Sequence, residues 1–544
     1  MEREKVSTII AKKLTTKNYS NPLDIIKKYS KSYQFSRAEI INTYINYCNG
    51  NNISVNKSLI EKIKLKPTRT ISGVVPITVL TKPFPCPGRC IFCPNDVMMP
   101  KSYLSLEPGA QRALMNKFDP YLQVKNRLQA MQNIGHTTEK LELLILGGTW
   151  SVYPHPYQEW FIKRCIQAMN EFEYKKETKY KYTKNKINFD TTSTETDPPE
   201  NWNIDELLKT QDINSTARYR CIGITLETRP DRITEGEAIH LRKIGGTRIQ
   251  LGIQSTDDLV LEKNKRGETS KNQKRAISIL RRTGFKIQIH WMPNLYGSSP
   301  RKDKEDIRRI YKDENYMPDE IKIYPCSIIE TAELYDYWKA KKYNPYTEEE
   351  LIEVLIYAKS HVKEFSRINR LIRDIPSTYI VDGNKKTNLR QVIQEIMKKR
   401  GKSCRCIRCN EIKTETINKI YSDIYRYNTS VSIEYFLTYK SNKKILGFLR
   451  LSIPKDSKEH FIEELRNSAI IREVHVYGRS LAIGEKTRGA QHIGLGTKLI
   501  KRAERIAKQY KFKKLAVISS IGTREYYKKK GFEQKSLYQI KEIK

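Results

Sequence analysis

The sequence predicts an α/β protein in which a partial barrel of six β/α units is joined to a smaller α+β domain, with a small basic helical module in front. Between Gly73 and Tyr324, short β-rich runs alternate with longer amphipathic stretches, which is typical of a parallel sheet covered by helices. After about Ser430, β-rich runs precede a glycine-containing loop and a helix. The length of 544 residues also fits several domains.

Charge indicates the class of partner. The sequence has 100 lysine and arginine residues against 61 acidic residues, a net charge of +39 at pH 7. Such a charge holds a protein on a polyanion through counterion release, so nucleic acid is the expected partner. The alternative is a lysine-rich surface that reflects genome composition, because Asn, Ile and Tyr are also abundant.

A cytoplasmic protein without a membrane partner is expected. The sequence has no run of about 18 apolar residues, and its N-terminus is charged from the second residue onward, unlike a secretory signal. Six of the ten cysteines fall in two tight clusters, which is typical of metal sites in a reducing compartment. Either a monomer or a homodimer fits the sequence.

The first two units follow in chain order. Residues 1–67 carry 13 basic and 5 acidic residues, and apolar positions recur there at helical spacing, which predicts a basic helical module. An ordinary solvated helical face is the alternative. The barrel is expected over residues 68–345, and residues 174–216 read as a surface insertion because they have few aliphatic side chains. The predicted strands are Val74–Leu80, Leu141–Leu146, Cys221–Leu226, Thr247–Ile253, Phe285–Trp291 and Glu320–Tyr324.

The remaining chain divides at about residue 430. Residues 346–429 read as a helical linker that contains the second cysteine cluster, and residues 430–544 as the α+β domain. In that domain, three strands are expected before the glycine loop, and a helix and a fourth strand after it. These elements are Val431–Tyr439, Lys444–Ile453, Ile471–Tyr477, Lys498–Gln509 and Leu515–Ser519.

The first cysteine cluster indicates radical chemistry. Cys86, Cys90 and Cys93 have the spacing C-x3-C-x2-C just after the first predicted strand. Three thiolates on one loop can hold three irons of a [4Fe–4S] cluster and leave the fourth iron open. S-adenosylmethionine chelates such an iron, and electron transfer then yields a 5′-deoxyadenosyl radical. A zinc site with a fourth ligand is the alternative.

Polar residues at the ends of the next strands are expected to contact this cofactor. Gly147, Gly148 and Thr149 follow the second strand, where bare backbone can approach the amino acid end of S-adenosylmethionine. Glu227 follows the third strand and Gln254 ends the fourth. Such positions line a site more often than they pack a core.

The second cysteine cluster predicts zinc. Cys404, Cys406 and Cys409 supply three thiolates, and structural zinc needs four ligands. Cys326 is the tentative fourth ligand, with His361 or water as alternatives. An auxiliary iron–sulfur cluster and the absence of metal are the competing interpretations. The arginines at 405 and 408 would also let this loop touch phosphate.

The glycine loop near the C-terminus predicts an acyl-CoA site. The motif Q-x-x-G-x-G opens a helix whose free N–H groups can bind a pyrophosphate, and its residues are Gln491, His492, Ile493, Gly494, Leu495, Gly496 and Thr497. With the strands around it, this loop indicates a GNAT-type acetyltransferase fold. Tyr526 and Tyr527 follow where that fold places a phenol near the CoA sulfur, so either can protonate the leaving thiolate. The alternative is that they only pack a helix onto the sheet.

The combination of a radical-SAM core and a GNAT domain resembles the family of the catalytic subunit of Elongator, in its single-chain form that modifies tRNA. Motifs from residue 68 to the C-terminus carry the resemblance. They are Cys86–Pro94, Glu107–Pro108, Asp119–Tyr121, Gly147–Thr149, Glu227–Asp231, Gly252–Ser255, His290–Pro293, Lys322–Pro325, Cys404–Cys409, Glu473–Gly478, Gln491–Gly496 and Gly522–Tyr527.

This resemblance implies carboxymethylation of C5 of the wobble uridine, position 34 of tRNA, by acetyl-CoA. In that scheme the deoxyadenosyl radical takes a hydrogen from the acetyl methyl group, the carbon radical adds to C5, and the thioester is later hydrolysed. The family also implies zinc in the linker, contact of residues 1–67 with the tRNA anticodon stem-loop, and an electron donor that the sequence does not identify. The rival functions are a protein lysine acetyltransferase with a structural iron–sulfur core and an inactive tRNA-binding scaffold. Because the radical must reach the acetyl group, we expect a large interface between the two domains and one shared basic cleft.

Overall fold

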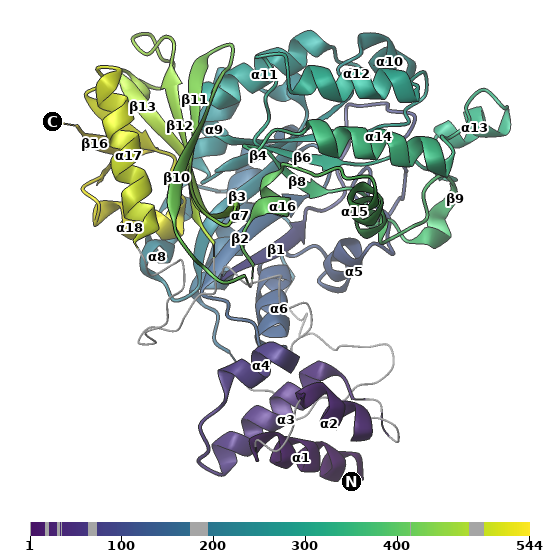
Figure 1. Cartoon of the computed structure of the whole chain (residues 1–544), viewed down its shortest axis with the longest axis vertical. Coiled ribbons are helices and arrows are strands. Elements are labelled where there is room, and N and C mark those ends of the chain that lie inside the picture. The colour runs from purple at the N-terminus through teal and green to yellow at the C-terminus, as the bar shows by residue number, and fades with distance from the viewer. Residues whose placement is uncertain are drawn as a thin grey trace.

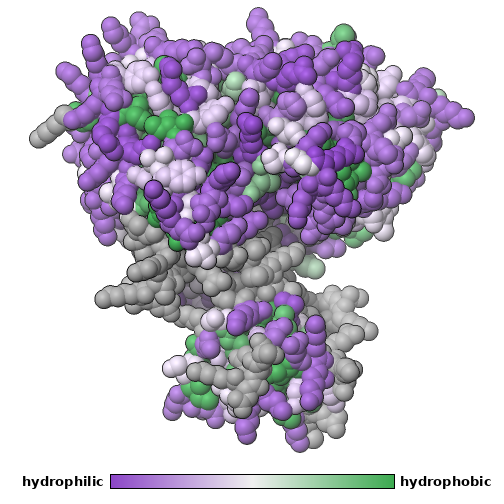
Figure 2. Space-filling view, viewed as in Figure 1, coloured by the Kyte–Doolittle hydropathy of each residue, from purple (hydrophilic) through white to green (hydrophobic). Residues whose placement is uncertain are grey.

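The computed structural model describes residues 2–16, 21–29, 33, 35–63, 73–174, 194–413, 415–477 and 494–543. A helical module stands below a larger body in which a parallel barrel and a second sheet lie side by side (Figure 1). The face turned to the viewer is mostly hydrophilic, with hydrophobic residues in scattered patches (Figure 2). In the described part of the chain, the longest apolar stretches of helix fall short of what a membrane crossing requires.

The N-terminal module packs four helices around a small apolar core. Its helices are α1 (Glu2–Thr15), α2 (Pro22–Tyr29), α3 (Arg37–Gly50) and α4 (Lys57–Ile63). Ile10, Ile40 and Tyr44 are buried in that core. Ser36 and Glu39 form a reciprocal capping box at the start of α3. The sequence therefore predicted the helical character of this module correctly.

The central sheet is the predicted parallel barrel with one additional strand. Its seven strands run in the order β1-β2-β3-β4-β5-β6-β8, and each neighbouring pair is parallel. The bounds are β1 (Val74–Leu80), β2 (Lys140–Leu146), β3 (Arg220–Thr228), β4 (Arg248–Gln254), β5 (Lys286–Trp291), β6 (Glu320–Ile323) and β8 (Arg367–Arg370). All six expected strands are present, and β8 comes from the segment expected to be a helical linker.

Helices cover the outer face of this sheet, where Ile249, Leu251, Ile287 and Ile289 are fully buried. They are α6 (Pro120–Asn133), α7 (His155–Asn170), α8 (Asp205–Thr216), α9 (Glu235–Lys243), α11 (Ser270–Arg282), α12 (Pro300–Ile310) and α14 (Glu348–His361). Two more helices, α5 (Pro108–Met115) and α10 (Asp258–Lys263), pack in smaller apolar clusters of their own. Smaller elements complete the linker side of the barrel. They are β7 (Ile328–Ile329), α13 (Leu334–Lys339), β9 (Ile380–Asp382), α15 (Leu389–Lys399) and α16 (Ile407–Asn410).

The predicted surface insertion at residues 174–216 is corrected at its C-terminal end. Residues 205–216 form α8, which packs against α7 and β3. Its buried side includes Leu207 but also Thr210, Gln211 and Asn214. Helical periodicity was hidden because the buried face is largely polar, and Asn214 is satisfied there by accepting from the backbone N–H of Cys221 at 2.7 Å. Residues 175–193 of the predicted insertion lie outside the described residues.

The C-terminal domain is a seven-stranded sheet in the order β10-β11-β12-β13-β14-β16-β15. Its strands are β10 (Tyr421–Asn428), β11 (Ser432–Ser441), β12 (Lys444–Pro454), β13 (Ser468–Val476), β14 (Lys514–Val517), β15 (Glu533–Gln534) and β16 (Gln539–Glu542). Helix α17 (Leu495–Gln509) packs on β11, β12 and β13, and α18 (Arg524–Lys528) follows β14. Strand β10 was not expected, because most of its side chains are exposed and carry no apolar pattern.

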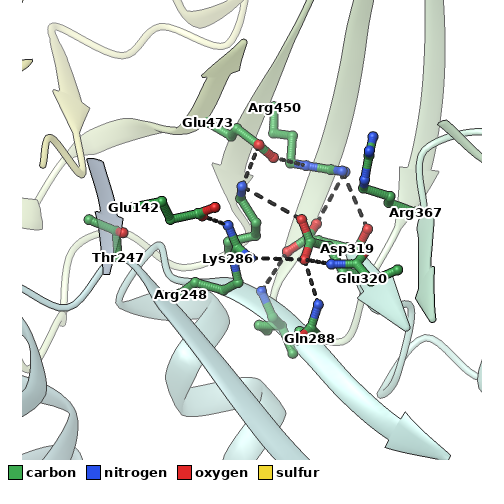
Figure 3. A network of polar contacts seen from close by, with 12 residues as sticks. Glu142, Thr247, Arg248, Lys286, Gln288, Asp319, Glu320, Arg367, Arg450 and Glu473 are labelled. Atoms are coloured by element: carbon green, nitrogen blue, oxygen red, sulfur yellow. Dashed lines mark hydrogen bonds and ion pairs between the residues drawn. The ribbon is translucent and has the colours of Figure 1, made fainter. Parts of the chain in front are cut away.

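The two sheets meet through a buried network of charges (Figure 3). Asp319, just before β6, receives two hydrogen bonds of 2.7 Å from Arg472 of β13 and an ion pair of 3.3 Å from Arg450 of β12. Lys286 of β5 pairs with Glu473, which also accepts from Arg450 at 2.8 Å. Burial opposes ionisation of Asp319, but Arg472 and Arg450 hold its pKa well below the ordinary value. The two domains are therefore in direct contact through buried charges, as expected.

Candidate active site and metal centres

The first cysteine loop lies beyond the carboxyl end of β1, as the sequence predicted. The thiol of Cys86 lies 3.6 Å from the hydroxyl of Thr149, and Arg266 donates to Cys90 Sγ at 3.5 Å. Burial and the neighbouring Cys90 thiol raise the pKa of Cys93 to about 11 without a metal. Metals bind the thiolate form of cysteine, which a nearby cation stabilises. Arg266 is such a cation, and it also suits the negative charge of an iron–sulfur cluster held by thiolates. The three cysteines thus fit the predicted [4Fe–4S] site.

The glycine pair after β2 brings bare backbone to the same place. Gly147 and Gly148 have φ values of +140° and +94°, which side chains rarely adopt. A Cβ on Gly147 would lie only 1.8 Å from Thr81 Oγ1 at the end of β1. Thr149, which is buried, then reaches Cys86. The predicted cofactor residues 147–149 and the cysteine loop are therefore adjacent, as an S-adenosylmethionine site would require.

The inner face of the barrel is polar over several strands. Glu227, Gln250 and Gln288 share one register row across β3, β4 and β5, and His290 and Lys322 share the next row across β5 and β6. The residues that alternate with them along β4 and β5 face outward and are aliphatic, namely Ile249, Leu251, Ile287 and Ile289. Barrel interiors normally hold branched apolar residues, so this polar lumen indicates a functional space.

Hydrogen bonds join Lys322, Gln250 and His290, and His290 Nδ1 lies 3.6 Å from Glu227 Oε1. Lys322 Nζ donates to Gln250 Oε1 at 2.5 Å, and the same oxygen lies 3.1 Å from His290 Nε2. Tyr103 donates to Glu227 at 3.3 Å. Burial lowers the pKa of Lys322 to about 8, although Glu227 acts in the opposite direction. Sequence reasoning missed Tyr103, which belongs to no quoted motif, and it assigned no role to Lys322, although the motif Lys322–Pro325 contains that residue.

Unpartnered polar atoms remain in this part of the site. Among the described residues, Gln250 Nε2, Gln254 Oε1 and Arg229 Nη1 are buried without a hydrogen-bond partner. Buried polar atoms are normally satisfied, so such groups are typical of a space that receives a polar ligand. Gln254 has φ of +62° at the end of β4, which turns its side chain away from the regular strand alternation. The side chains of Gln254 and Arg266 both lie beside Gly252, and Arg266 donates to Cys90, while contact of Gln254 and Glu227 with the cofactor stays a prediction.

The second cysteine cluster forms a compact group. The sulfur atoms of Cys404, Cys406 and Cys409 lie within 4.8 Å of one another, and no other group in the described ranges meets that criterion. Tetrahedral zinc with bonds of about 2.3 Å places its sulfur ligands roughly 3.8 Å apart, so this triad fits zinc. The buried Lys359 donates to Cys409 Sγ at 3.8 Å, and Gln394 does so at 3.7 Å.

The tentative fourth zinc ligand, Cys326, is corrected. Its thiol does not belong to the compact group. It is buried instead in an apolar cluster with Ile91, Val260 and Leu295, where burial raises its pKa to about 12. Sequence spacing cannot reveal that a distant cysteine packs beside the first cluster rather than the second. His361, the alternative ligand, also lies outside the compact group and turns Nδ1 to the carbonyl of Tyr357 at 2.8 Å.

The described part of the acyl-CoA loop has the expected form. Gly494, with φ of +70°, precedes α17, and its helix begins with Leu495, Gly496 and Thr497. A Cβ on Gly496 would lie 2.5 Å from the hydroxyl of Tyr526, so the phenol stands against this loop. The other predicted residues of the loop, Gln491, His492 and Ile493, lie outside the described residues.

The two candidate tyrosines have different environments. Tyr526 is 41% exposed and burial raises its pKa, which keeps the phenol protonated. Tyr527 is buried in the apolar core of the sheet and contacts Phe532 edge to face at 5.7 Å. The packing interpretation therefore describes Tyr527, and Tyr526 is the phenol placed at the glycine loop.

The cysteine loop and the second sheet contact opposite ends of the barrel strands, and the expected shared basic cleft stays a prediction. Arg266 links Cys90 to the carboxyl end of β4 by donating to Gly252 O. In contrast, β13 of the second sheet meets the amino ends of β5 and β6 through Lys286 and Asp319. The polar lumen lies between these ends. Sequence motifs locate each site but do not indicate which end of the barrel carries the second domain.

Comparison with known proteins identifies three matched segments. Residues 85–310 match the radical SAM superfamily, residues 318–399 a radical SAM C-terminal domain, and residues 409–532 the acetyltransferase (GNAT) family. A tRNA uridine(34) acetyltransferase of Methanocaldococcus infernus is 40% identical over 510 residues, which cover 90% of this chain and 89% of the relative. Elongator complex protein 3 of Saccharomyces cerevisiae is 31% identical over 95% of this chain and 91% of its own length. The solved structure of archaeal Methanocaldococcus infernus Elp3 with an N-terminal deletion has a TM-score of 0.72 at 36% identity and covers 87% of this chain and all of that chain.

Proposed function

This chain belongs to the family of Elongator complex protein 3 and the tRNA uridine(34) acetyltransferases, and on that premise we propose that it carboxymethylates C5 of uridine 34 in tRNA with acetyl-CoA. One observation carries the proposal: a radical-SAM segment with its cysteine loop and a GNAT segment with its glycine loop belong to one chain, and a buried charge network joins the two domains. Neither half alone explains this arrangement. A protein lysine acetyltransferase would leave the cysteine loop and the lumen without a role.

The residues that would hold the cofactors follow from the site. Cys86, Cys90 and Cys93 would bind a [4Fe–4S] cluster, and residues 147–149 with Glu227 and Gln254 would bind S-adenosylmethionine. The loop at Gly494–Thr497 would bind acetyl-CoA. When bound, these groups supply a 5′-deoxyadenosyl radical and an acetyl unit.

The chain's own residues position the reactants and move protons. Tyr526, protonated at neutral pH, donates its phenolic proton to the thiolate of CoA when that thiolate leaves. Lys322 provides a cation in the lumen that can hold a carbonyl oxygen of the acetyl unit or of uracil. The ion network at the domain interface fixes the distance between the two sites.

The supporting parts have separate roles. Cys404, Cys406 and Cys409 would bind a structural zinc ion that shapes the linker. Residues 1–67 would contact the tRNA, since their basic composition suits an RNA backbone. A one-electron donor of unknown identity would reduce the iron–sulfur cluster, and the enzyme would act as a monomer or a homodimer.

The test is reconstitution under anaerobic conditions. The protein with iron, S-adenosylmethionine, acetyl-CoA, reductant and unmodified tRNA should yield 5-carboxymethyluridine, detected by mass spectrometry of digested nucleosides. Cys90→Ala should abolish this product while tRNA binding is retained, since Cys90 lies in the cluster loop and not in the basic module. Acetyl transfer to a protein substrate without any dependence on tRNA would instead support a protein acetyltransferase.

A further inference from the structure

A cavity of about 520 Å³ lies beside the cysteine-rich loop, away from both candidate sites. Its lining residues come from α12, α14 and the loop between α15 and α16, helices that are labelled in Figure 1. Lys304 comes from α12, Tyr357 and His361 from α14, and Lys402 and Arg405 from the loop. The cavity is therefore built from three elements that are far apart in the sequence.

The charge of this cavity is positive and not neutralised within the described chain. Lys304, Lys402 and Arg405 line it, and none of the three makes an ion pair with another described residue. The one carboxylate among the described lining residues, Glu353, is paired with Arg400. Three cations that converge without a counter-charge favour an anionic ligand.

The other lining groups suit a nucleotide rather than a bare anion. His361 is exposed and stacks on Tyr357 with ring centroids 3.8 Å apart and an angle of 20°. Arg308 holds the Tyr357 hydroxyl at 2.6 Å. Ser360 Oγ is buried and has no partner among the described residues. Aromatic faces beside cations are what single-stranded nucleic acid uses, because a base stacks while its phosphate is paired.

Arg405 and Arg408, the two arginines of the second cysteine loop, point in different directions. Arg408 turns inward and donates to the carbonyl of Asn369 at 2.7 Å. Arg405 is exposed and faces the cavity. Arg405 lies on the same loop as the cysteine triad Cys404, Cys406 and Cys409. A metal ion bound by the triad would therefore also fix one wall of the cavity.

We propose that this cavity binds a phosphodiester-linked nucleotide of the tRNA substrate, with Lys304, Lys402 and Arg405 on the phosphate and His361 beneath the base. The inference rests on the proposed function for the identity of the RNA. It adds a second RNA contact on the linker side of the barrel, distinct from the basic N-terminal module.

The test measures tRNA binding as a function of salt in the full-length protein. The variant Lys304→Ala/Lys402→Ala is compared with Lys398→Ala/Lys399→Ala, which removes the same charge from exposed positions of α15 that do not line the cavity. Each phosphate contact that is lost should reduce the slope of log affinity against log salt by about 1. We expect a slope lower by about 2 for the first variant, and an unchanged slope for the control.

Two further measurements keep the inference open to refutation. His361→Ala should weaken binding without changing the salt slope, because stacking releases no counterion. A titration with AMP separates a nucleotide of the RNA from a free nucleotide. Equal slopes for the two lysine variants would overturn the proposal, as would saturable AMP binding that leaves tRNA binding untouched. Product formation at saturating tRNA is scored separately, so a wild-type protein that binds tRNA normally and makes no carboxymethyluridine would refute the proposed function and not this contact.

Discussion

Removal of Arg472 should loosen the contact between the barrel and the acetyltransferase domain. Its guanidinium is fully buried and donates to Asp319 at 2.7 Å, to Glu434 at 3.0 Å and to the carbonyl of Phe285 at 2.9 Å. In Arg472→Met, Asp319 retains only Arg450 as a charged partner among these contacts. Loss of one member of a buried ion pair costs about 3–5 kcal/mol, because the remaining charge stays desolvated. A cost of about 4 kcal/mol lowers the folding equilibrium constant roughly 10³-fold.

The assay is urea unfolding followed by fluorescence, together with product formation per S-adenosylmethionine cleaved. The exposed pair Lys535–Glu533 provides the control, since Lys535→Met should change stability by about 1 kcal/mol at most. The double variant Arg472→Met/Asp319→Asn should recover part of the loss, because the unpaired carboxylate is gone. A stability of Arg472→Met within about 1 kcal/mol of the wild type would refute the reasoning.

Acid should weaken the same interface. Burial disfavours the charged form of Glu473, but Lys286 and Arg450 lower its pKa to about 2. The folded pKa lies below the unfolded pKa of about 4.3, so the stabilisation is complete above that value and is lost as the pH falls toward 2. Thermal unfolding between pH 7 and pH 3 measures this loss. Glu473→Gln should reduce the slope of stability against pH in the acid range, and an unchanged slope would contradict the assignment.

Three further predictions concern individual side chains. Tyr526→Phe should slow tRNA-dependent CoA release by about 10²-fold, which a thiol reagent measures. Tyr527→Phe should mainly alter stability, because Tyr527 lies in the apolar core. Equal effects of the two variants on CoA release would contradict the different roles assigned to the two phenols. The pKa of Lys322 is lowered by burial to about 8, so its cation is lost as the pH rises through that value, and carboxymethyluridine formation should fall there. Lys322→Arg should remain active above that pH, because arginine keeps its charge there. Identical pH profiles for the variant and the wild type would exclude Lys322 as the cation that holds a carbonyl oxygen. Cys406→Ser should lose zinc while retaining iron, and elemental analysis of the purified protein measures both metals. Full zinc occupancy in this variant would show that the cysteine triad is not the zinc site.

Much of the fold could be predicted because the outward faces of the barrel strands are continuously apolar. Strands β4 and β5, for example, carry Ile249, Leu251, Ile287 and Ile289, all fully buried. Both cysteine clusters were found from spacing, because a metal site needs several ligands on one short loop. The glycine loops were found from spacing together with the predicted strands around them. Local chemistry of that kind is visible in one sequence.

Features that depend on distant contacts could not be predicted. Strand β8 has only four residues, of which Arg367 and Arg370 are charged, so its alternation was invisible. Helix α8 buries polar side chains that are satisfied only by other elements. Tyr103 and Lys322 reach the lumen from unrelated segments, and Cys326 packs away from the zinc triad although the sequence offers it as a ligand.

The central claim is that the radical formed at the cysteine loop and the acetyl group bound at the glycine loop react with each other. The most direct test uses acetyl-CoA with a fully deuterated methyl group in the anaerobic reaction with tRNA. The account predicts 5′-deoxyadenosine that has gained one deuterium and carboxymethyluridine that retains two. Carboxymethyluridine formed alongside 5′-deoxyadenosine without deuterium would contradict it.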